Sequence, residues 1–172
     1  MATSAQHQDG KLHERIQKQV FDALETQALL SHRRSFVVDI EIRRLALETM
    51  LKIAEVHGHT IIHGWDSIFI ACGAACDQVE AKKAAGGKAV RSAAPLIKVA
   101  FALLQKVASD LLPSLSEKQL RASIDDFASF TLQPEDVNVS LSAVGALWGV
   151  TADVQRRCQE DGRDASALWQ HL

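Results

Sequence analysis

The chain has few of the residues on which β-structure and disulfide frameworks depend. Its 172 residues include no tyrosine, only 5% aromatic residues and three cysteines. Strands draw on aromatic and β-branched residues, whereas the abundant Ala and Leu of this sequence lead the helix-propensity scale. The cysteines are odd in number and scattered, which does not fit a secreted disulfide framework. These shortages predict an all-α domain in the cytosol.

An excess of charge of either sign is also missing. Nineteen Lys and Arg residues face 21 Asp and Glu residues, for a net charge of −2 at pH 7. No basic excess therefore points to a nucleic-acid partner. No uninterrupted apolar run approaches the roughly 18 residues of a membrane span, and the first ten residues do not resemble a signal peptide. With 47% hydrophobic residues, the chain can still bury the core of one domain.

Apolar residues recur at helical spacing through most of the sequence. We expect six helices of about 15 to 20 residues, over 11–30 and 38–57 and then beginning near 64, 95, 116 and 137. Gly58 is expected to end the second helix in the left-handed conformation. Ser116 and Gln119 have the spacing of a capping box, which predicts the start of the fifth helix.

The spacing of the helices favours a repeat architecture. The predicted second, fourth and sixth helices start about 57 and 42 residues apart, and the shorter interval fits a HEAT or armadillo unit. We expect an all-α, HEAT- or armadillo-like α-solenoid fragment of six to seven helices, although a closed helical bundle remains an alternative. The helical-repeat domain would span 11–172, after a disordered arm over 1–10 and with a mobile loop near 84–92. The apolar end at 167–172 suggests a piece of a longer protein.

Histidines and cysteines raise the question of a zinc site. His57, His59 and His63 precede Cys72 and Cys76, but a structural zinc site needs four convergent ligands, usually from two close pairs. Both cysteines fall on a predicted apolar helix stripe, where a thiol packs as a small hydrophobe. We therefore expect no metal site and no cofactor.

Two further patterns fall short of an active site. Asp125 and Asp126 are adjacent on a predicted helix, so their side chains diverge by about 100° and do not form an acid–base dyad. Gly86-Gly87-Lys88 lacks the earlier glycine and the following Ser or Thr of a phosphate loop. The sequence therefore predicts no catalytic residue.

Two charged regions are candidates for contact with a partner. The region around the expected loop is basic and would suit anionic lipid head groups or an acidic partner. Its candidate residues are Lys82, Lys83, Lys88 and Arg91. The region of the fifth helix is acidic and is a candidate docking surface. Its candidate residues are Asp125, Asp126, Glu135 and Asp136.

The apolar pattern also predicts which large side chains form the core. Val137, Leu141, Val144 and Trp148 recur on one face of the sixth helix. We expect the tryptophan of this face to be buried, together with Trp65 and Phe69 of the third helix. Arg43, near the start of the second helix, is expected to bridge neighbouring helices.

Particular stretches resemble a known group of proteins. Ile42-Arg43-Arg44-Leu45-Ala46, followed by Gly64-Trp65-Asp66-Ser67-Ile68-Phe69, is similar to the helices downstream of the catalytic domain in large Arf guanine-nucleotide exchange factors. The later stretch 110–148, with Asp136-Val137-Asn138-Val139-Ser140-Leu141 and Gly145-Ala146-Leu147-Trp148, resembles the Mon-two (monensin-sensitivity) family more specifically. That family is related to the exchange factors but lacks their catalytic domain. The resemblance covers about 38–150.

The resemblance implies a role in membrane traffic. It implies a non-catalytic helical-repeat docking module in a scaffold that acts in vesicle-mediated protein transport between the late Golgi and endosomes. The scaffold would be cytosolic and peripheral on membranes of the trans-Golgi network and endosomes. Its implied partners are a Dopey-type protein, Arf-like small GTPases and the neighbouring repeats of a longer chain.

Two other functions remain open at this point. The chain could be the regulatory downstream domain of a true Arf exchange factor, which would carry a catalytic domain on its N-terminal side. It could also be a small cysteine or metal hydrolase, for which stoichiometric zinc or an unusually reactive Cys72 or Cys76 would be the evidence.

Overall fold

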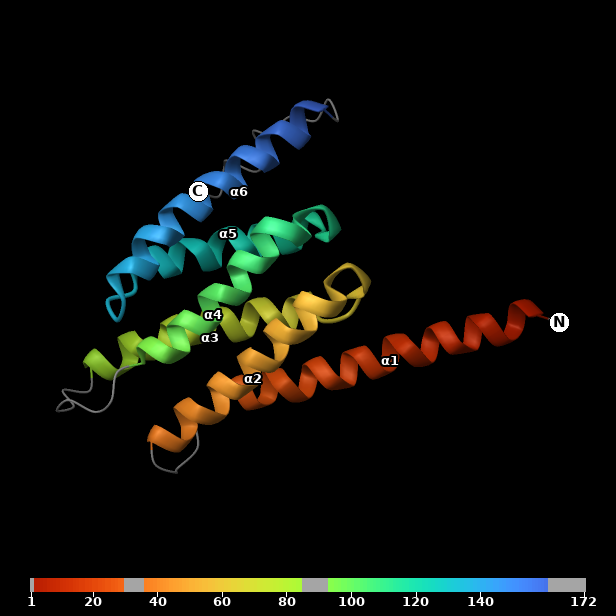
Figure 1. Cartoon of the computed structure of the whole chain (residues 1–172), viewed down its shortest axis with the longest axis horizontal. Helices are drawn as coiled ribbons and strands as arrows, with labels where there is room; N and C mark the ends of the chain where they lie inside the picture. Colours follow the sequence, from red (N-terminus) through yellow and green to blue (C-terminus); the bar gives the residue numbers. More distant parts are fainter. Residues whose placement is uncertain (1, 30–35, 85–92, 161–172) are drawn as a thin grey trace.

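The computed structural model describes residues 2–29, 36–84 and 93–160, which form helices joined by short turns (Figure 1). The α-helices are α1 (Ala2–Leu29), α2 (Phe36–His57), α3 (Trp65–Ala84), α4 (Ala94–Lys106), α5 (Glu117–Leu132) and α6 (Val137–Glu160). Two short 3-10 helices, η1 (Gly58–Thr60) and η3 (Leu112–Ser114), and one π-helical turn, η2 (Val107–Leu111), complete the structure of these ranges. No strand occurs within these three ranges. The prediction of an all-α fold is confirmed.

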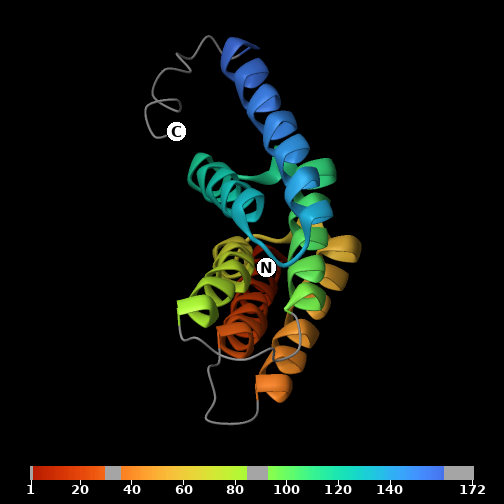
Figure 2. The same cartoon turned by 90° about the vertical axis from the view of Figure 1, so that its left-hand side faces the viewer.

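The helices lie in two layers, which Figure 2 shows from the side. In one layer α3 packs against α1 and α5, and in the other α4 packs against α2 and α6. The consecutive pairs α1–α2, α3–α4 and α5–α6 make contact across the layers. Units that contact only their neighbours in sequence are typical of helical repeats. The structure is therefore an all-α helical-repeat fragment, as predicted, and not a closed bundle.

The core lies between the layers and is centred on α4. Its leucines Leu96, Leu103 and Leu104 are fully buried, because α2, α3 and α6 surround this helix. Phe101 of α4 meets two rings of α5, with ring-centroid distances of 6.2 Å to Phe127 and 5.7 Å to Phe130. This aromatic cluster joins the second helix pair to the third.

Some helix boundaries differ from the expectation. The backbone is helical from Ala2, within the stretch 1–10 that the sequence assigns to a disordered arm. The apolar stripe starts only at Leu12, so burial gives no sequence signal for these residues, but no proline interrupts them. The predicted loop near 84–92 lies outside the described residues except for Ala84, and the predicted final segment at 165–172 lies outside them entirely.

Gly58 ends α2 for a different reason from the one predicted. Its backbone is not in the left-handed region, and the residue is buried at the start of η1. A Cβ atom on Gly58 would lie only 2.6 Å from Cδ1 of Leu111. The close approach of η2 to the end of α2 requires the glycine, so the predicted left-handed stop is wrong.

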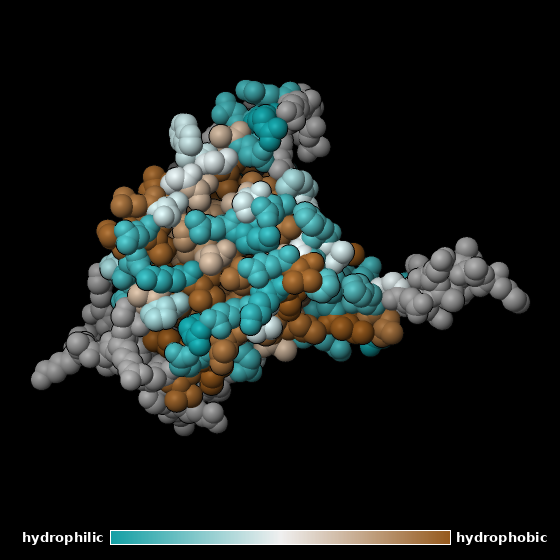
Figure 3. Space-filling view, in the orientation of Figure 1, coloured by the Kyte–Doolittle hydropathy of each residue, from teal (hydrophilic) through white to brown (hydrophobic). Residues whose placement is uncertain are grey.

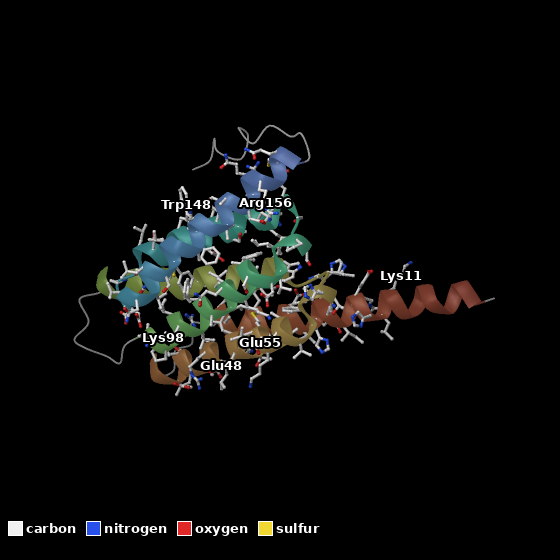
Figure 4. All side chains as sticks on the ribbon, turned by 45° about the horizontal axis from the view of Figure 1, so that its top comes forward. Lys11, Glu48, Glu55, Lys98, Trp148 and Arg156 are labelled. Atoms are coloured by element: carbon white, nitrogen blue, oxygen red, sulfur yellow. The ribbon has the colours of Figure 1, made fainter. Side chains whose placement is uncertain are left out.

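The expected core residues divide into two groups. Trp65 and Phe69 are buried, as predicted, and Nε1 of Trp65 donates a hydrogen bond of 3.1 Å to the carbonyl oxygen of Ile61. Trp148 is 78% exposed and projects from α6 away from the other helices (Figure 4). The prediction that it belongs to the core is wrong, because α6 has apolar residues on two sides and spacing alone does not tell which side is covered.

Arg43 joins two helices, as predicted. Its side chain is buried, and Nη2 donates a hydrogen bond of 3.2 Å to the carbonyl oxygen of Leu29, the last residue of α1. Burial lowers the pKa of the Arg43 guanidinium, whereas nearby Asp39 raises it. This contact satisfies a terminal carbonyl of α1, which has no partner within its own helix.

Candidate interaction surfaces

The basic candidate region lies largely outside the described residues. Lys82 and Lys83 belong to the last turns of α3, whereas Lys88 and Arg91 fall in the undescribed stretch 85–92. The candidate contact of these four residues with lipid or an acidic partner therefore stays a prediction.

The paired aspartates of α5 point in different directions. Asp125 is exposed, whereas Asp126 is only 9% exposed and faces α3. A Cβ atom built on Gly73 of α3 would lie 2.9 Å from Oδ1 of Asp126. This divergence follows from their adjacency on one helix. Asp125 is exposed, as the candidate docking surface requires, whereas Asp126 is not.

Glu135 and Asp136 have structural roles at helix ends. Oε2 of Glu135 accepts a hydrogen bond of 2.9 Å from the backbone N–H of Ala93, at the start of α4. Oδ1 of Asp136 accepts from the backbone N–H groups of Asn138 and Val139, at 2.9 and 3.2 Å, and so caps α6. The four acidic candidates therefore do not form one continuous acidic surface.

Lys98 forms an ion pair with the Asp136 carboxylate. Its Nζ lies 3.2 Å from Oδ2 of Asp136 and links α4 to the start of α6. This contact, together with the backbone donors of Val139 and Asn138, lowers the pKa of Asp136. The carboxylate is thereby held in its charged form, which suits the positive end of the α6 dipole.

Asp125 and Asp126 do share one groove between α3 and α5. The groove has a volume of about 430 Å³ and is lined mainly by apolar and small residues, which are Leu29, Phe69, Ile70, Gly73, Ala74 and Ala122. An exposed carboxylate at the edge of an apolar groove suits a segment that combines an apolar and a cationic side chain. Of the four acidic candidates, Asp125 and Asp126 line this groove.

The cysteines and histidines do not form a reactive centre in the described part of the chain. Cys72 is fully buried, with Sγ 3.6 Å from the carbonyl oxygen of Ala100. Burial raises the pKa of the Cys72 thiol well above its ordinary value, and Asp126 and Cys76 raise it further. A raised pKa disfavours the nucleophilic thiolate. Within the described ranges, no three His, Cys, Asp or Glu side chains are arranged to hold a metal ion.

Apolar residues occupy two opposite sides of α6. The inner side faces α5 and α4 and is buried, with residues Val139, Ala143, Val150 and Val154. The opposite side is 55–78% exposed, and we name its residues the outer stripe of α6: Val137, Leu141, Val144 and Trp148. Figure 3 shows hydrophobic residues gathered along the edge of the molecule at the first half of α6. The predicted shared face exists, but it points to solvent.

The outer stripe lies within an uncharged stretch, which a search for continuous apolar runs does not detect. No Asp, Glu, Lys or Arg occurs in residues 137–152. By length and composition alone, Val137–Arg156 would be long and apolar enough to cross a membrane. Asn138, Ser140 and Ser142 interrupt the apolar run and hide this property from a search for continuous hydrophobic residues. A count of charges along the helix would have found it.

Comparison with known proteins shows which proteins this chain is similar to. No family model matches it, and no solved structure matches it. It is 33% identical over 128 residues to "Protein MON2 homolog" of Schizosaccharomyces pombe, an alignment that covers 71% of this chain. Proteins of the same name are 30% identical over 118 residues in Xenopus laevis and 28% identical over 140 residues in Homo sapiens, covering 68% and 81% of this chain.

The relatives are far longer than this chain. The alignments cover 7%, 6% and 7% of the fission yeast, frog and human proteins, respectively. The matched part corresponds to most of the helical array and to a small part of each relative. One name recurs in the fungal, frog and human relatives, at 28–33% identity. This chain therefore belongs to the MON2 family.

Proposed function

We propose that this chain is a non-catalytic docking segment of a peripheral scaffold in vesicle-mediated protein transport between the late Golgi and endosomes. Membership of the MON2 family supports the proposal. The resemblance of the chain to this family, the monensin-sensitivity proteins, implies such a role. The same resemblance suggests a Dopey-type protein and Arf-like small GTPases as partners. It also suggests a location on membranes of the trans-Golgi network and endosomes.

A docking role is supported by the contacts of the polar side chains, which serve to hold the helices together. Glu135, Asp136 and Arg43 bind helix ends, and the most deeply buried thiol, Cys72, is disfavoured as a nucleophile by its raised pKa. These groups stabilise the helical array. The groove between α3 and α5, with Asp125 at its edge, is a surface that suits a protein ligand.

Binding of purified partners tests the proposal. The chain should bind the Dopey-type protein or an Arf-like GTPase, and a fluorescent fusion should colocalise with a trans-Golgi marker. Asp125→Lys should weaken binding by about tenfold if the groove is used, because it reverses the charge at the groove edge. Glu55→Lys, an equal charge change at an exposed position of α2, is the matched control. A diffuse fusion that binds neither partner would contradict the proposal.

Membrane contact is tested separately by flotation with liposomes that contain anionic lipid. Replacement of all four basic candidates by Ala should reduce flotation if they contact head groups. These replacements are at Lys82, Lys83, Lys88 and Arg91. The control removes four cations elsewhere, at Lys11, Arg15, Lys18 and Lys52. Equal flotation of the two variants would dismiss a specific role for the basic candidates.

A further inference from the structure

The outer stripe of α6 is an apolar helix face that no described residue covers. Its four side chains are 55–78% exposed, and Leu132 at the end of α5 is exposed as well. The stripe positions are separated by 4, 3 and 4 residues, the spacing by which helices pack on one another. α6 therefore has two faces suited to helix packing, and the described helices cover only the inner one.

The position of α6 in its layer explains why the outer face is open. α4, in the same layer, has α2 on one side and α6 on the other, and its leucines are fully buried. α6 has α4 on one side, and no described helix lies on its other side (Figures 1 and 2). The outer stripe thus continues the interface that already joins α2, α4 and α6.

We propose that the outer stripe of α6 is the stacking surface for an adjoining helical repeat in the full-length family protein. The occupant is an amphipathic α-helix of that repeat, in the same polypeptide. The length of the relatives supports this choice, because the matched segment is only 7% of the fission yeast protein. This inference rests on the family and the helical layers, and it is independent of the proposed transport function.

The chemistry of the stripe specifies an uncharged, apolar contact face on the partner helix. No charged side chain occurs in residues 137–152, so an ionic partner would lose its hydration without gaining a counter-charge. Beside the stripe, Cβ atoms added to Gly145 or Gly149 would meet nothing within 4 Å. These small residues leave room for the backbone of a second helix to approach closely.

The same features disfavour a membrane surface and a second copy as the occupant. Helices that lie on anionic membranes usually have Lys and Arg on their polar side, whereas the outer stripe is flanked by Asn138 and Ser142 and begins next to Asp136. A face of 16 helical residues is only about 24 Å long and 10 Å wide. Pairing two such faces would bury much less than the roughly 1,600 Å² of a standard stable interface.

The test compares the same change in a short and a long protein. Leu141→Gln with Trp148→Gln should change the melting temperature of the 172-residue chain by less than about 2 °C, since both side chains are already exposed. Gln at the counterparts of these two residues in the full-length Schizosaccharomyces pombe relative should speed amide hydrogen exchange in the helix that carries them by about tenfold or more. Ile62→Gln, at another exposed apolar residue, and its aligned counterpart should have little effect in either protein.

Each other occupant gives a different result and would overturn the proposal. A 172-residue chain that is dimeric by light scattering, and monomeric as the double variant, would assign the stripe to a second copy. Liposome flotation that the double variant alone loses would assign it to a membrane. Unchanged hydrogen exchange in the full-length relative would show that no adjoining repeat covers the helix. Loss of Golgi localisation would affect only the proposed function.

Discussion

Two glycines lie against buried side chains that leave no room for a methyl group. A Cβ atom would approach Leu111 to 2.6 Å at Gly58 and Phe21 to 2.4 Å at Gly64. Both neighbouring side chains are buried and cannot move into solvent. Gly58→Ala should therefore lower the free energy of unfolding by about 1–3 kcal/mol through overpacking, as measured by urea denaturation.

Gly145→Ala provides the matched control for this prediction. Gly145 is exposed within α6, and a Cβ atom there would meet nothing within 4 Å. The same substitution should raise the free energy of unfolding by about 0.5–1 kcal/mol, because alanine favours the helix. Equal effects at the two positions would contradict the close approach of Leu111 as the reason for Gly58.

Asp136 links stability to pH. Its pKa is lowered first by Lys98 and then by the backbone donors of Val139 and Asn138. A group with a lowered pKa stabilises the fold above its unfolded pKa of about 3.9, and the stabilisation is lost as the pH falls through the folded pKa. Asp136→Asn should therefore lower the melting temperature at pH 7 and should make less difference at an acid pH below the folded pKa of Asp136. Asp125→Asn, at an exposed position, should show little difference at either pH.

At the scale of the element, α5 begins with a capping box, which the sequence predicts and the structure shows. Oγ of Ser116 accepts from the backbone N–H of Gln119, and Oε1 of Gln119 accepts from the backbone N–H of Ser116. Ser116→Ala should lower the free energy of unfolding by about 0.5–2 kcal/mol. Ser142→Ala, on the exposed side of α6, is the control and should be nearly neutral. A loss equal to that control would argue against a capping role for Ser116.

Local signals explain how much of the fold the sequence predicts. Pro95 lies in the first turn of α4, as expected, and Ser116 precedes α5, because proline geometry and capping depend on a few adjacent residues. Spacing likewise predicts the helices and the shared face of Val137, Leu141, Val144 and Trp148. Which face is covered depends on the neighbouring helices, which spacing does not specify. The burial of Trp148 and the left-handed Gly58 were therefore predicted incorrectly.

The candidate surfaces were less predictable than the helices, because an acidic composition does not reveal hydrogen-bond partners. Asp125 and Asp126 are adjacent in sequence, yet one is exposed and the other faces α3. Glu135 bonds to Ala93, 42 residues away in sequence, and only the folded structure brings these two residues together. The apolar outer stripe of α6 was visible as a pattern, but its exposure was not.

At the scale of the molecule, the aromatic cluster of Phe101, Phe127 and Phe130 should determine how far unfolding spreads. These rings join α4 to α5, and in repeat proteins stability depends on contacts between neighbouring units. Phe127 is fully buried, so Phe127→Ala should lower the free energy of unfolding by about 3–5 kcal/mol. Phe127→Leu, which keeps most of the apolar volume, should cost less.

The helices that lose protection from hydrogen exchange in Phe127→Ala distinguish a repeat array from a single cooperative core. Because α2 packs mainly against α1 and α4, whereas α5 packs mainly against α6 and α3, Phe127→Ala should speed amide hydrogen exchange first in α5 and α6. Protection in α1 and α2 should persist, since local openings follow structural units. Hydrogen exchange with peptide resolution measures both ends of the array in one experiment. An equal loss of protection in all helices would show that the layers unfold as one unit, which would contradict nearest-neighbour stacking as the source of their stability.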